Sequence, residues 1–346
     1  MPYEIGTYRF DLERFFPKRL FERITDIRVH HPDVVYETAQ ARRRRPKMVG
    51  ADGNLMILAA DHPARRITAS AGDPLVMGDR RAYLGRILRI MADPRCDGVL
   101  GTPDIIEDLL IVDHLIKQAG GASLLDGRVL AGTMNRGGLA GTAFEMADTF
   151  TAYTAQGLCR FRLDAAKVMF RLDVDSPDAL QTITQCSQAV TDCVRSGLPI
   201  FIEPLPVRKT PAGYEVLKSP ADLIQIVGVA SALGESSLGT WIKIPYTEDY
   251  PRVTRSTTCP ILMLGGESRG NPAPTLYDFA DGMAVGGNVR GAMVGRNVHH
   301  PGADDPLAVA LAVYSIVHEG CSGDEAVARL MGSRNLSLDA LTRYVQ

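Results

Sequence analysis

The segment TWIKIPY, residues 240–246, has the composition of a buried β-strand and carries a lysine, Lys243, at its centre. Successive side chains of a strand point to opposite faces, so Lys243 shares a face with Trp241 and not with Ile242. A charged side chain inside an apolar strand costs free energy unless it is paired or close to solvent. We therefore expect other strands to supply polar partners to the face that carries Lys243.

Seven further apolar runs of similar length alternate with longer amphipathic segments between residues 54 and 300. This alternation is typical of repeated βα units, in which each strand is followed by a helix. The eight runs are LMILAAD (55–61), GVLGT (98–102), RVLAGTM (128–134), AAKVMFRLD (165–173), IFIEPL (200–205), TWIKIPY (240–246), PILMLGG (260–266) and GAMVGRNV (291–298). Eight such units predict an α/β fold of the closed (β/α)8 kind, a TIM barrel, rather than an open doubly wound sheet.

The residues before this repeat carry apolar side chains at helical spacings, namely Phe15, Leu20, Phe21 and Ile24. We predict an N-terminal helical extension over residues 1–50 and a barrel over residues 51–346. The extension ends in the basic run Arg42 to Arg45. A basic run of this kind can either bind a polyanion or lie exposed to solvent at the end of a helix. Because no aromatic residues are interleaved and the whole chain is not basic, we interpret it as a solvated helix end.

The composition is that of an ordinary globular protein, with 346 residues, 45% hydrophobic and 23% charged, and a net charge of −2. This balance gives no field that would attract nucleic acid or a membrane, so we expect a small-molecule partner. The N-terminal sequence lacks the apolar core of a secretory signal, no stretch is apolar for long enough to span a bilayer, and the cysteines form no C-x-x-C pair. We expect a cytoplasmic protein with reduced thiols.

Charged residues lie within or at the end of four of the apolar runs, at Asp61, Lys167, Glu203 and Lys243. The active site of a (β/α)8 barrel lies at the carboxyl ends of its strands, and the parity of each residue is compatible with an inward side chain. Two lysines and two carboxylates at one mouth stabilise one another, either as a structural ion-pair network or as a catalytic site. Their shared place at strand ends favours the catalytic interpretation.

A lysine acts as a nucleophile when the pKa of its ammonium group falls towards neutrality, and an apolar pocket or a second nearby cation lowers that pKa. Lys243 and Lys167 provide such an arrangement. The neutral amine would attack a ketone or aldehyde, and the iminium formed would withdraw electrons during cleavage or formation of a C–C bond. Glu203 and Asp61 would then transfer protons and hold hydroxyl groups.

The last two runs end in glycine-rich turns, LGGESRGN at 264–271 and VGRNV at 294–298. Barrel enzymes commonly bind phosphate at this edge. Either turn alone is best interpreted as an ordinary turn, but two on adjacent strands favour an anion site. The predicted phosphate-binding residues are Gly265, Gly266, Gly295 and Arg296, which offer backbone N–H groups and a guanidinium.

The seven histidines do not suggest a metal site, since only His62, His299 and His300 fall near the predicted mouth. Adjacent residues seldom point at one ion, so we interpret the His299–His300 pair as a polar loop. We expect neither a catalytic metal nor another cofactor.

Taken in order, the motifs MILAADHPARR, AAKVM, FIEPL, WIKIPY, LMLGG and VGRNV resemble those of the class I, Schiff-base aldolase superfamily. That superfamily includes deoxyribose-phosphate aldolase, tagatose-bisphosphate aldolase and the DhnA-type fructose-bisphosphate aldolases, and the resemblance covers residues 54–300. It implies that Lys243 forms the Schiff base, that Lys167 assists it and that Glu203 transfers protons. It also implies that Asp61 binds a substrate hydroxyl or assists carbinolamine turnover, and that the two glycine-rich turns with Arg296 bind phosphate.

Two segments depart from the superfamily pattern, PYTEDY after Lys243 and HHPGADD after Arg296, so the carbon skeleton of the substrate stays open. The chain also resembles barrel proteins linked to inositol catabolism. This implies cleavage of a phosphorylated deoxy-ketogluconate to dihydroxyacetone phosphate and malonate semialdehyde. A thiolase-like acyl transferase and a sugar-phosphate-binding barrel without catalysis are the alternatives. We further expect a homo-oligomer.

Overall fold

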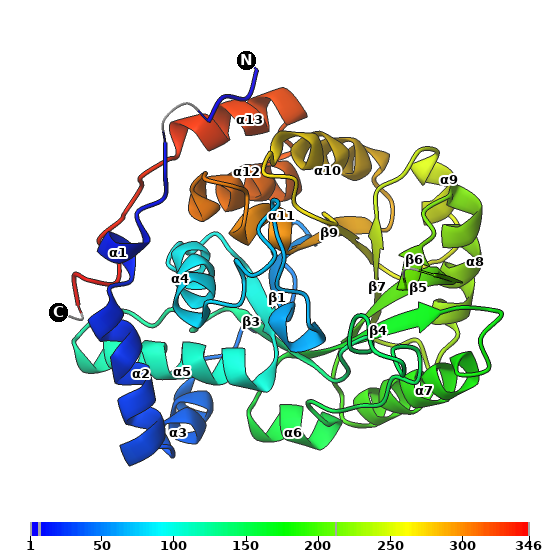
Figure 1. Ribbon diagram of the computed structural model, residues 1–346, viewed down its shortest axis with the longest axis horizontal. Helices are drawn as coiled ribbons and strands as arrows, with labels where there is room; N and C mark the ends of the chain where they lie inside the picture. Colours follow the sequence, from blue (N-terminus) through cyan, green and yellow to red (C-terminus); the bar gives the residue numbers. More distant parts are fainter. Residues whose placement is uncertain (1, 6–7, 212, 345–346) are drawn as a thin grey trace.

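The computed structural model describes residues 2–5, 8–211 and 213–344 and contains a closed barrel of parallel strands surrounded by helices (Figure 1). The strands follow the order β4-β3-β2-β1-β9-β8-β7-β5, and pairing of β4 with β5 closes the ring. The barrel strands are β1 (Leu55–Ala60), β2 (Gly98–Gly101), β3 (Val129–Thr133), β4 (Ala165–Leu172), β5 (Ile200–Thr210), β7 (Thr240–Pro245), β8 (Ile261–Leu264) and β9 (Val289–Val294). The predicted (β/α)8 fold is confirmed.

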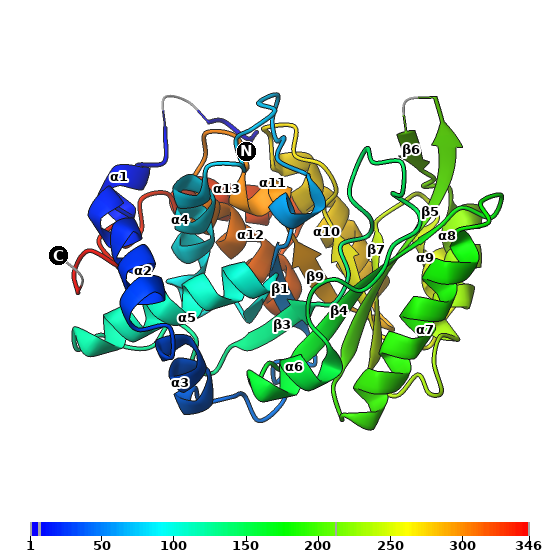
Figure 2. The ribbon, with the colours of Figure 1, turned by 60° about the horizontal axis from the view of Figure 1, so that its bottom comes forward.

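Helices connect the strands and cover the outside of the barrel, as Figure 2 shows from a second direction. They are α1 (Leu12–Phe15), α2 (Lys18–His30), α3 (Val34–Ala41), η1 (Pro63–Arg65), α4 (Arg80–Met91), α5 (Pro103–Gln118), α6 (Ala155–Arg160), α7 (Ala179–Arg195), α8 (Pro220–Ser231), α9 (Tyr250–Thr254), α10 (Ala273–Val285), α11 (Arg296–His299), α12 (Pro306–Glu319) and α13 (Gly323–Gly332).

Two details of the strands differ from the prediction. After β5 the chain forms an antiparallel pairing with the short strand β6 (Gly213–Val216), so the sixth strand of the barrel carries the label β7. The last predicted run, 291–298, extends beyond the strand itself. β9 stops at Val294, the chain turns at Gly295 within the predicted glycine-rich turn, and α11 begins at Arg296.

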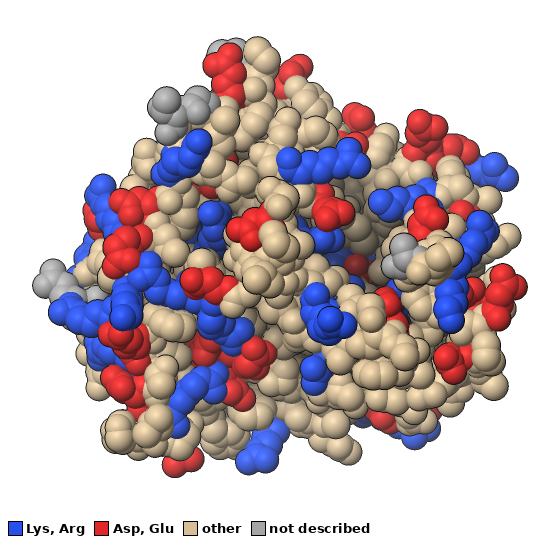
Figure 3. Space-filling model, in the orientation of Figure 1, with Lys and Arg blue, Asp and Glu red and all other residues tan. Residues whose placement is uncertain are grey.

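The strands are buried on both faces, as expected for a parallel sheet covered by helices. Inward side chains form one cluster inside the barrel, made up of Leu55, Ile57, Ala59, Leu100, Val129, Ala131, Ala165, Phe201, Trp241, Leu262 and Met293. Ile242 and Ile244 belong instead to the larger cluster between the strands and the outer helices. The predicted parity of the strand with Lys243 is therefore confirmed. The space-filling view in Figure 3, which has the orientation of Figure 1, has a hollow near its middle, where acidic and basic side chains both lie.

The N-terminal helices pack on the outside of the barrel. Phe15, Leu20 and Ile24 are buried in the same apolar cluster as the outer faces of the strands. The predicted helical extension is thus confirmed. A boundary between residues 50 and 51 stays a prediction, and its outer bounds, residues 1 and 346, lie outside the described residues. No helix in the described part of the chain is long and apolar enough to cross a membrane.

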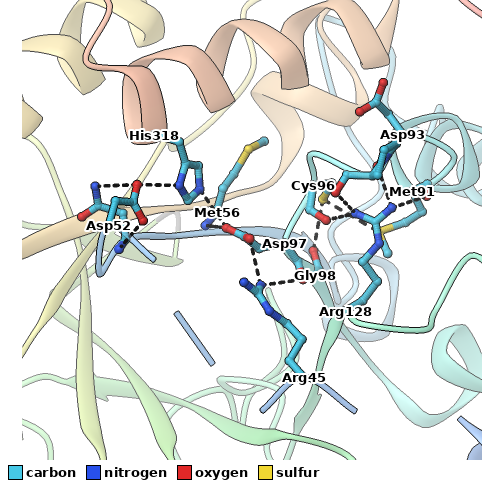
Figure 4. A network of polar contacts seen from close by, with 12 residues as sticks. Arg45, Asp52, Met56, Met91, Asp93, Cys96, Asp97, Gly98, Arg128 and His318 are labelled. Atoms are coloured by element: carbon cyan, nitrogen blue, oxygen red, sulfur yellow. Dashed lines mark hydrogen bonds and ion pairs between the residues drawn. The ribbon is translucent and has the colours of Figure 1, made fainter. Parts of the chain in front are cut away.

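In the arginine run that follows α3, Arg43 and Arg44 are exposed, but Arg42 is buried and Arg45 is half-buried, so the prediction of a solvated helix end was wrong for these two. The Arg42 guanidinium is 2% exposed and donates to Asp164 Oδ2 at 2.9 Å, and Arg44 Nε donates to Asp164 Oδ1 at 2.6 Å. Arg45 donates to Asp97 Oδ1 at 2.8 Å (Figure 4). Asp97 and Asp164 come directly before β2 and β4, so the run ties the extension to the amino end of the barrel. Asp97 and Asp164 are distant from the arginine run in the sequence, so no local pattern predicted that they would pair with it.

Arg42→Met tests this attachment. We expect the free energy of unfolding to fall by about 3 kcal/mol, because removing one partner of a buried ion pair leaves an uncompensated charge. Arg43→Met is the matched control. The Arg43 side chain is 80% exposed and lies 4.0 Å from Asp126, so its loss should change stability by less than about 0.5 kcal/mol. Denaturant unfolding measures both, and equal effects would contradict the distinction between the two arginines.

His318 of α12 joins the same end of the barrel (Figure 4). Its Nδ1 lies 2.8 Å from Asp52 Oδ2 and its Nε2 lies 2.9 Å from Asp97 Oδ2. An imidazole that donates to two carboxylates is in its protonated form. Burial opposes this charge, but the hydrogen bonds and negative charges of Asp97 and Asp52 dominate and raise the pKa of His318 above its usual value.

This geometry predicts a pH-dependent contribution to stability. Because the folded-state pKa is raised, the contribution is fully present below the unfolded pKa, about 6.5, and is lost as pH rises through the folded pKa. His318→Gln should therefore lower the free energy of unfolding most at about pH 5.5, by roughly 1–3 kcal/mol, and less at higher pH. His30→Gln, at an exposed position of α2, is the control. A difference between His318→Gln and the parent that grows with pH would contradict the assignment.

Candidate active site

The structure brings the four predicted catalytic residues into one chain of ion pairs at the barrel mouth. Lys167 Nζ lies 3.0 Å from Asp61 Oδ2 and 3.0 Å from Glu203 Oε2, and Lys243 Nζ lies 2.9 Å from the same Glu203 oxygen. All four are buried, with at most 6% of any residue exposed. We call this set (Asp61, Lys167, Glu203 and Lys243) the mouth cluster.

The strand order explains how these side chains meet. Lys167 on β4 and Glu203 on β5 belong to neighbouring strands, and β7, which carries Lys243, pairs with the other edge of β5. Asp61 follows β1, which β2 and β3 separate from β4, so the contact of Lys167 with Asp61 crosses the inside of the mouth.

Burial and charge within the mouth cluster shift the pKa values of Asp61, Glu203 and Lys243. Burial alone would raise the pKa of each carboxyl group, but Lys167 with Arg65 holds the pKa of Asp61 well below its usual range, and Lys167 with Lys243 lowers the pKa of Glu203 to about 2. Burial lowers the pKa of Lys243, and the positive charge of Lys167 adds to this effect while Glu203 opposes it. Both carboxylates therefore stay ionised, and Lys243 is made readier to lose its proton.

The predicted phosphate-binding residues also meet. The Asn297 side chain donates to the carbonyl of Gly265 and so joins the turn after β8 to the start of α11. Gly266 has a φ of +70°, which favours glycine. A Cβ on Gly295 would lie 2.6 Å from His62 Cε1, so only glycine fits there. These turns lie beside the mouth cluster, but a close approach of their backbone to a ligand stays a prediction.

Arg296 is half-buried at the first position of α11. Its nearest carboxylate is Glu267 Oε1, at 3.8 Å, and its buried Nε has no hydrogen-bond partner among the described residues.

Sequence reasoning missed Arg65, the last residue of η1, four positions after Asp61. Its side chain donates no hydrogen bond to any residue that the structure describes, and its Nε is buried. Its positive charge acts on Asp61 and Glu203. The available signal was its place in the first loop after a strand end, where barrel enzymes carry functional residues.

His299 and His300 do not form a polar loop, and that prediction was wrong. Both are buried, their Nδ1 atoms lie 2.6 Å apart, and both rings pack on Tyr83 of α4. The His62 ring contacts His299 edge-on, with 5.2 Å between centroids. The short helix α11 turns the pair inward, which an adjacent-histidine motif does not reveal. Burial lowers the pKa of His62 to about 3 and those of His299 and His300 in the same direction, so the rings are neutral.

No group of three or more His, Cys, Asp or Glu residues in the described ranges could hold a metal ion.

The β5–β6 hairpin borders the mouth on one side. The β5–β6 hairpin rises above the barrel in Figure 2. Arg171 of β4 stacks on Tyr214 of this hairpin, 5.2 Å from the ring centroid, and pairs with Glu145 in the loop after β3. These contacts join hairpin and loop beside the mouth cluster.

Comparisons with known proteins show which family and which solved barrels the chain is similar to. The model of the family described as Cgl0159-like matches residues 53–315. The crystal structure of Cgl0159 from Corynebacterium glutamicum is 34% identical, with a TM-score of 0.80 over 92% of this chain and 100% of that one. The predicted resemblance to the class I aldolase superfamily is confirmed at the level of the fold by two more distant structures.

One of these is a Schiff-base-forming fructose-1,6-bisphosphate aldolase, 19% identical with a TM-score of 0.54 over 82% of this chain and 100% of that one. The other, a fructose-bisphosphate aldolase from Slackia heliotrinireducens, is 16% identical with a TM-score of 0.59 over 95% and 98%. A curated relative, the 2-amino-3,7-dideoxy-D-threo-hept-6-ulosonate synthase of Halobacterium salinarum, is 28% identical over 171 residues, which are 49% of this chain and 60% of that protein.

Lys167→Met should raise the pKa of Lys243, because it removes the positive charge that disfavours the Lys243 ammonium group. The pH profile for reaction of Lys243 with a 1,3-diketone, which forms a coloured enaminone only with the neutral amine, should then move to higher pH. Lys209→Met, at an exposed position of β5, is the control for the loss of a lysine. Lys167→Arg keeps the charge and should stay closer to the parent profile. An unchanged profile in a folded Lys167→Met protein would show that Lys167 does not tune Lys243.

Proposed function

The chain belongs to the Cgl0159-like family, and from this premise we propose that it is a class I aldolase in which Lys243 forms a Schiff base with a phosphorylated ketose or keto acid. The observation that carries the proposal is the buried contact of Lys243 Nζ with Glu203 Oε2, 2.9 Å long, with Lys167 Nζ 3.0 Å from the same oxygen. The aldolase-like fold supports it, since the lysine lies on the sixth barrel strand.

The first step is loss of a proton from Lys243. Burial and the neighbouring ammonium of Lys167 favour the neutral amine. The amine then attacks the substrate carbonyl carbon, a C–N bond forms, and the carbonyl oxygen takes up a proton to give a carbinolamine. Loss of water leaves an iminium ion. Its positive charge replaces that of the ammonium, so the attraction to Glu203 is kept.

The second step is cleavage of the C–C bond. The electron pair of that bond moves into the iminium to give an enamine, while the hydroxyl proton of the leaving aldehyde passes to Glu203. Glu203 returns the proton to the enamine carbon, and water hydrolyses the new iminium to release the ketone and regenerate Lys243. Asp61, held by Lys167, lies opposite Glu203 and would orient a substrate hydroxyl.

The phosphate of the substrate would bind at Gly265, Gly266, Gly295 and Arg296. The proposed substrates, phosphorylated ketoses and keto acids, include the phosphorylated deoxy-ketogluconate implied by the resemblance to proteins of inositol catabolism. A cytoplasmic homo-oligomer remains part of the proposal.

Borohydride trapping tests the Schiff base. Incubation with a panel of ketose phosphates, dihydroxyacetone phosphate and the deoxy-ketogluconate phosphate, followed by borohydride, should irreversibly inactivate the enzyme. Mass spectrometry of peptides should find the mass of the reduced substrate on Lys243. Lys243→Met should take up no label, and EDTA should leave trapping unchanged because the chemistry needs no metal.

Several outcomes would contradict the proposal. Label on Lys167 instead of Lys243 would show that the roles of the two lysines are the reverse of those proposed. If no member of the panel forms an adduct, the Schiff-base mechanism is contradicted. A coenzyme A product would favour the acyl transferase, and binding without turnover would favour a barrel that only binds sugar phosphates.

A further inference from the structure

Two arginines at the mouth lack the partners that other shielded arginines in the described chain have. Arg65 makes no side-chain hydrogen bond or ion pair with a described residue, and Arg296 approaches only Glu267, whose side chain is 71% exposed and 3.8 Å away. The Nε atoms of both are buried. By contrast, the buried Arg89 forms a two-pronged pair with Asp305, at 3.0 and 2.7 Å. Unpaired buried donors are costly, so they indicate a place for a ligand.

The fold sets these two arginines side by side. Arg65 ends η1, the short helix that follows β1, and Arg296 begins α11, which follows β9. β1 and β9 are paired neighbours, with Leu58 opposite Val294. The two segments touch, since His62 lies where a Cβ of Gly295 would stand. The positive charge of Arg65 is close enough to add to the effect of burial in lowering the pKa of Arg296.

The charges of the mouth cluster do not neutralise them. Within that cluster two lysines face two carboxylates at contact distance, so its charges balance. Arg65 and Arg296 are left as two positive charges at its edge, with the solvated Glu267 as the one carboxylate within 4.0 Å of either among the described residues. Two neighbouring guanidinium groups are suited to a group with two negative charges and several acceptor oxygens.

We propose that Arg65 and Arg296 form the two arms of a clamp that holds one phosphate monoester dianion of the substrate, and that Arg65 is a specificity-determining residue of this enzyme. The inference rests on the phosphate site of the proposed function and adds Arg65 to it. Because Arg65 and Arg296 both bind the same phosphate, the enzyme prefers phosphorylated substrates to substrates that end in a single carboxylate.

The test uses the full-length protein and inorganic phosphate, titrated by calorimetry. Arg65→Met and Arg296→Met should each weaken phosphate binding by about tenfold or more, since hydrogen bonds to charged groups contribute on that scale. Arg65→Lys keeps the charge without the planar fork and should lie between Arg65→Met and the parent. Acetate, a single carboxylate, should bind at least about tenfold more weakly than phosphate to the parent protein.

Arg66→Met is the matched control. Arg66 follows Arg65 directly, but its side chain is exposed and donates to the carbonyl of Ala140, so phosphate affinity should not change. Thermal unfolding of every variant without phosphate checks that each is folded.

Unchanged phosphate affinity in folded Arg65→Met, with the loss confined to Arg296→Met, would overturn the clamp. Equal losses in Arg65→Met and Arg66→Met would overturn it as well. Phosphate binding needs no Schiff base, so the clamp and the aldolase proposal fail separately. In Arg65→Met, trapping with dihydroxyacetone phosphate should fall by a larger factor than trapping with unphosphorylated dihydroxyacetone, which carries no group for the clamp to bind. If no ketone is trapped while phosphate binding depends on Arg65, the aldolase proposal fails and the clamp stands.

Discussion

Lys167 is wholly buried and lies 3.0 Å from a carboxylate oxygen on each side, and the geometry of the mouth depends on this double contact. An ammonium group removed from water is costly unless opposite charges surround it, so Asp61 and Glu203 must both be present and ionised. Glu203 can then hold Lys243 with the oxygen that it already presents to Lys167. Four charges from four strands are thereby fixed across the inside of the barrel.

The same pairing prepares the site for chemistry as well as for stability. Carboxylates with lowered pKa values are ionised before the reaction begins, while a buried lysine beside a second cation gives up its proton more easily. The arrangement therefore disfavours the charged form of Lys243, while it favours the charged forms of Asp61 and Glu203. The neutral rings of His62 and His299 contact each other beside Asp61 without adding charge to the mouth.

Charge pairing serves a different purpose at the opposite end of the barrel. There Arg42 and His318 pair with carboxylates that precede or flank the strands, and every one of these contacts joins segments far apart in the chain. The amino end of a (β/α)8 barrel contributes to stability, and the carboxyl end carries the functional groups. The guanidinium groups of Arg65 and Arg296, whose buried Nε atoms have no hydrogen-bond partner among the described residues, lie at the end where a ligand can satisfy them.

The sequence by itself determined the barrel, the eight strand positions and the inward parity of Lys243, because side-chain alternation and the βα rhythm are local properties. It also identified the mouth cluster, since a charge late in an apolar strand is a local anomaly. The partners of those charges were decided only by the tertiary structure. Asp61 and Lys167 are 106 positions apart, and their contact exists only once the barrel has closed. The burial of Arg42, the inward turn of His299 and the unpaired Arg65 were hidden for the same reason: burial and charge pairing depend on neighbours in space, which no local pattern encodes.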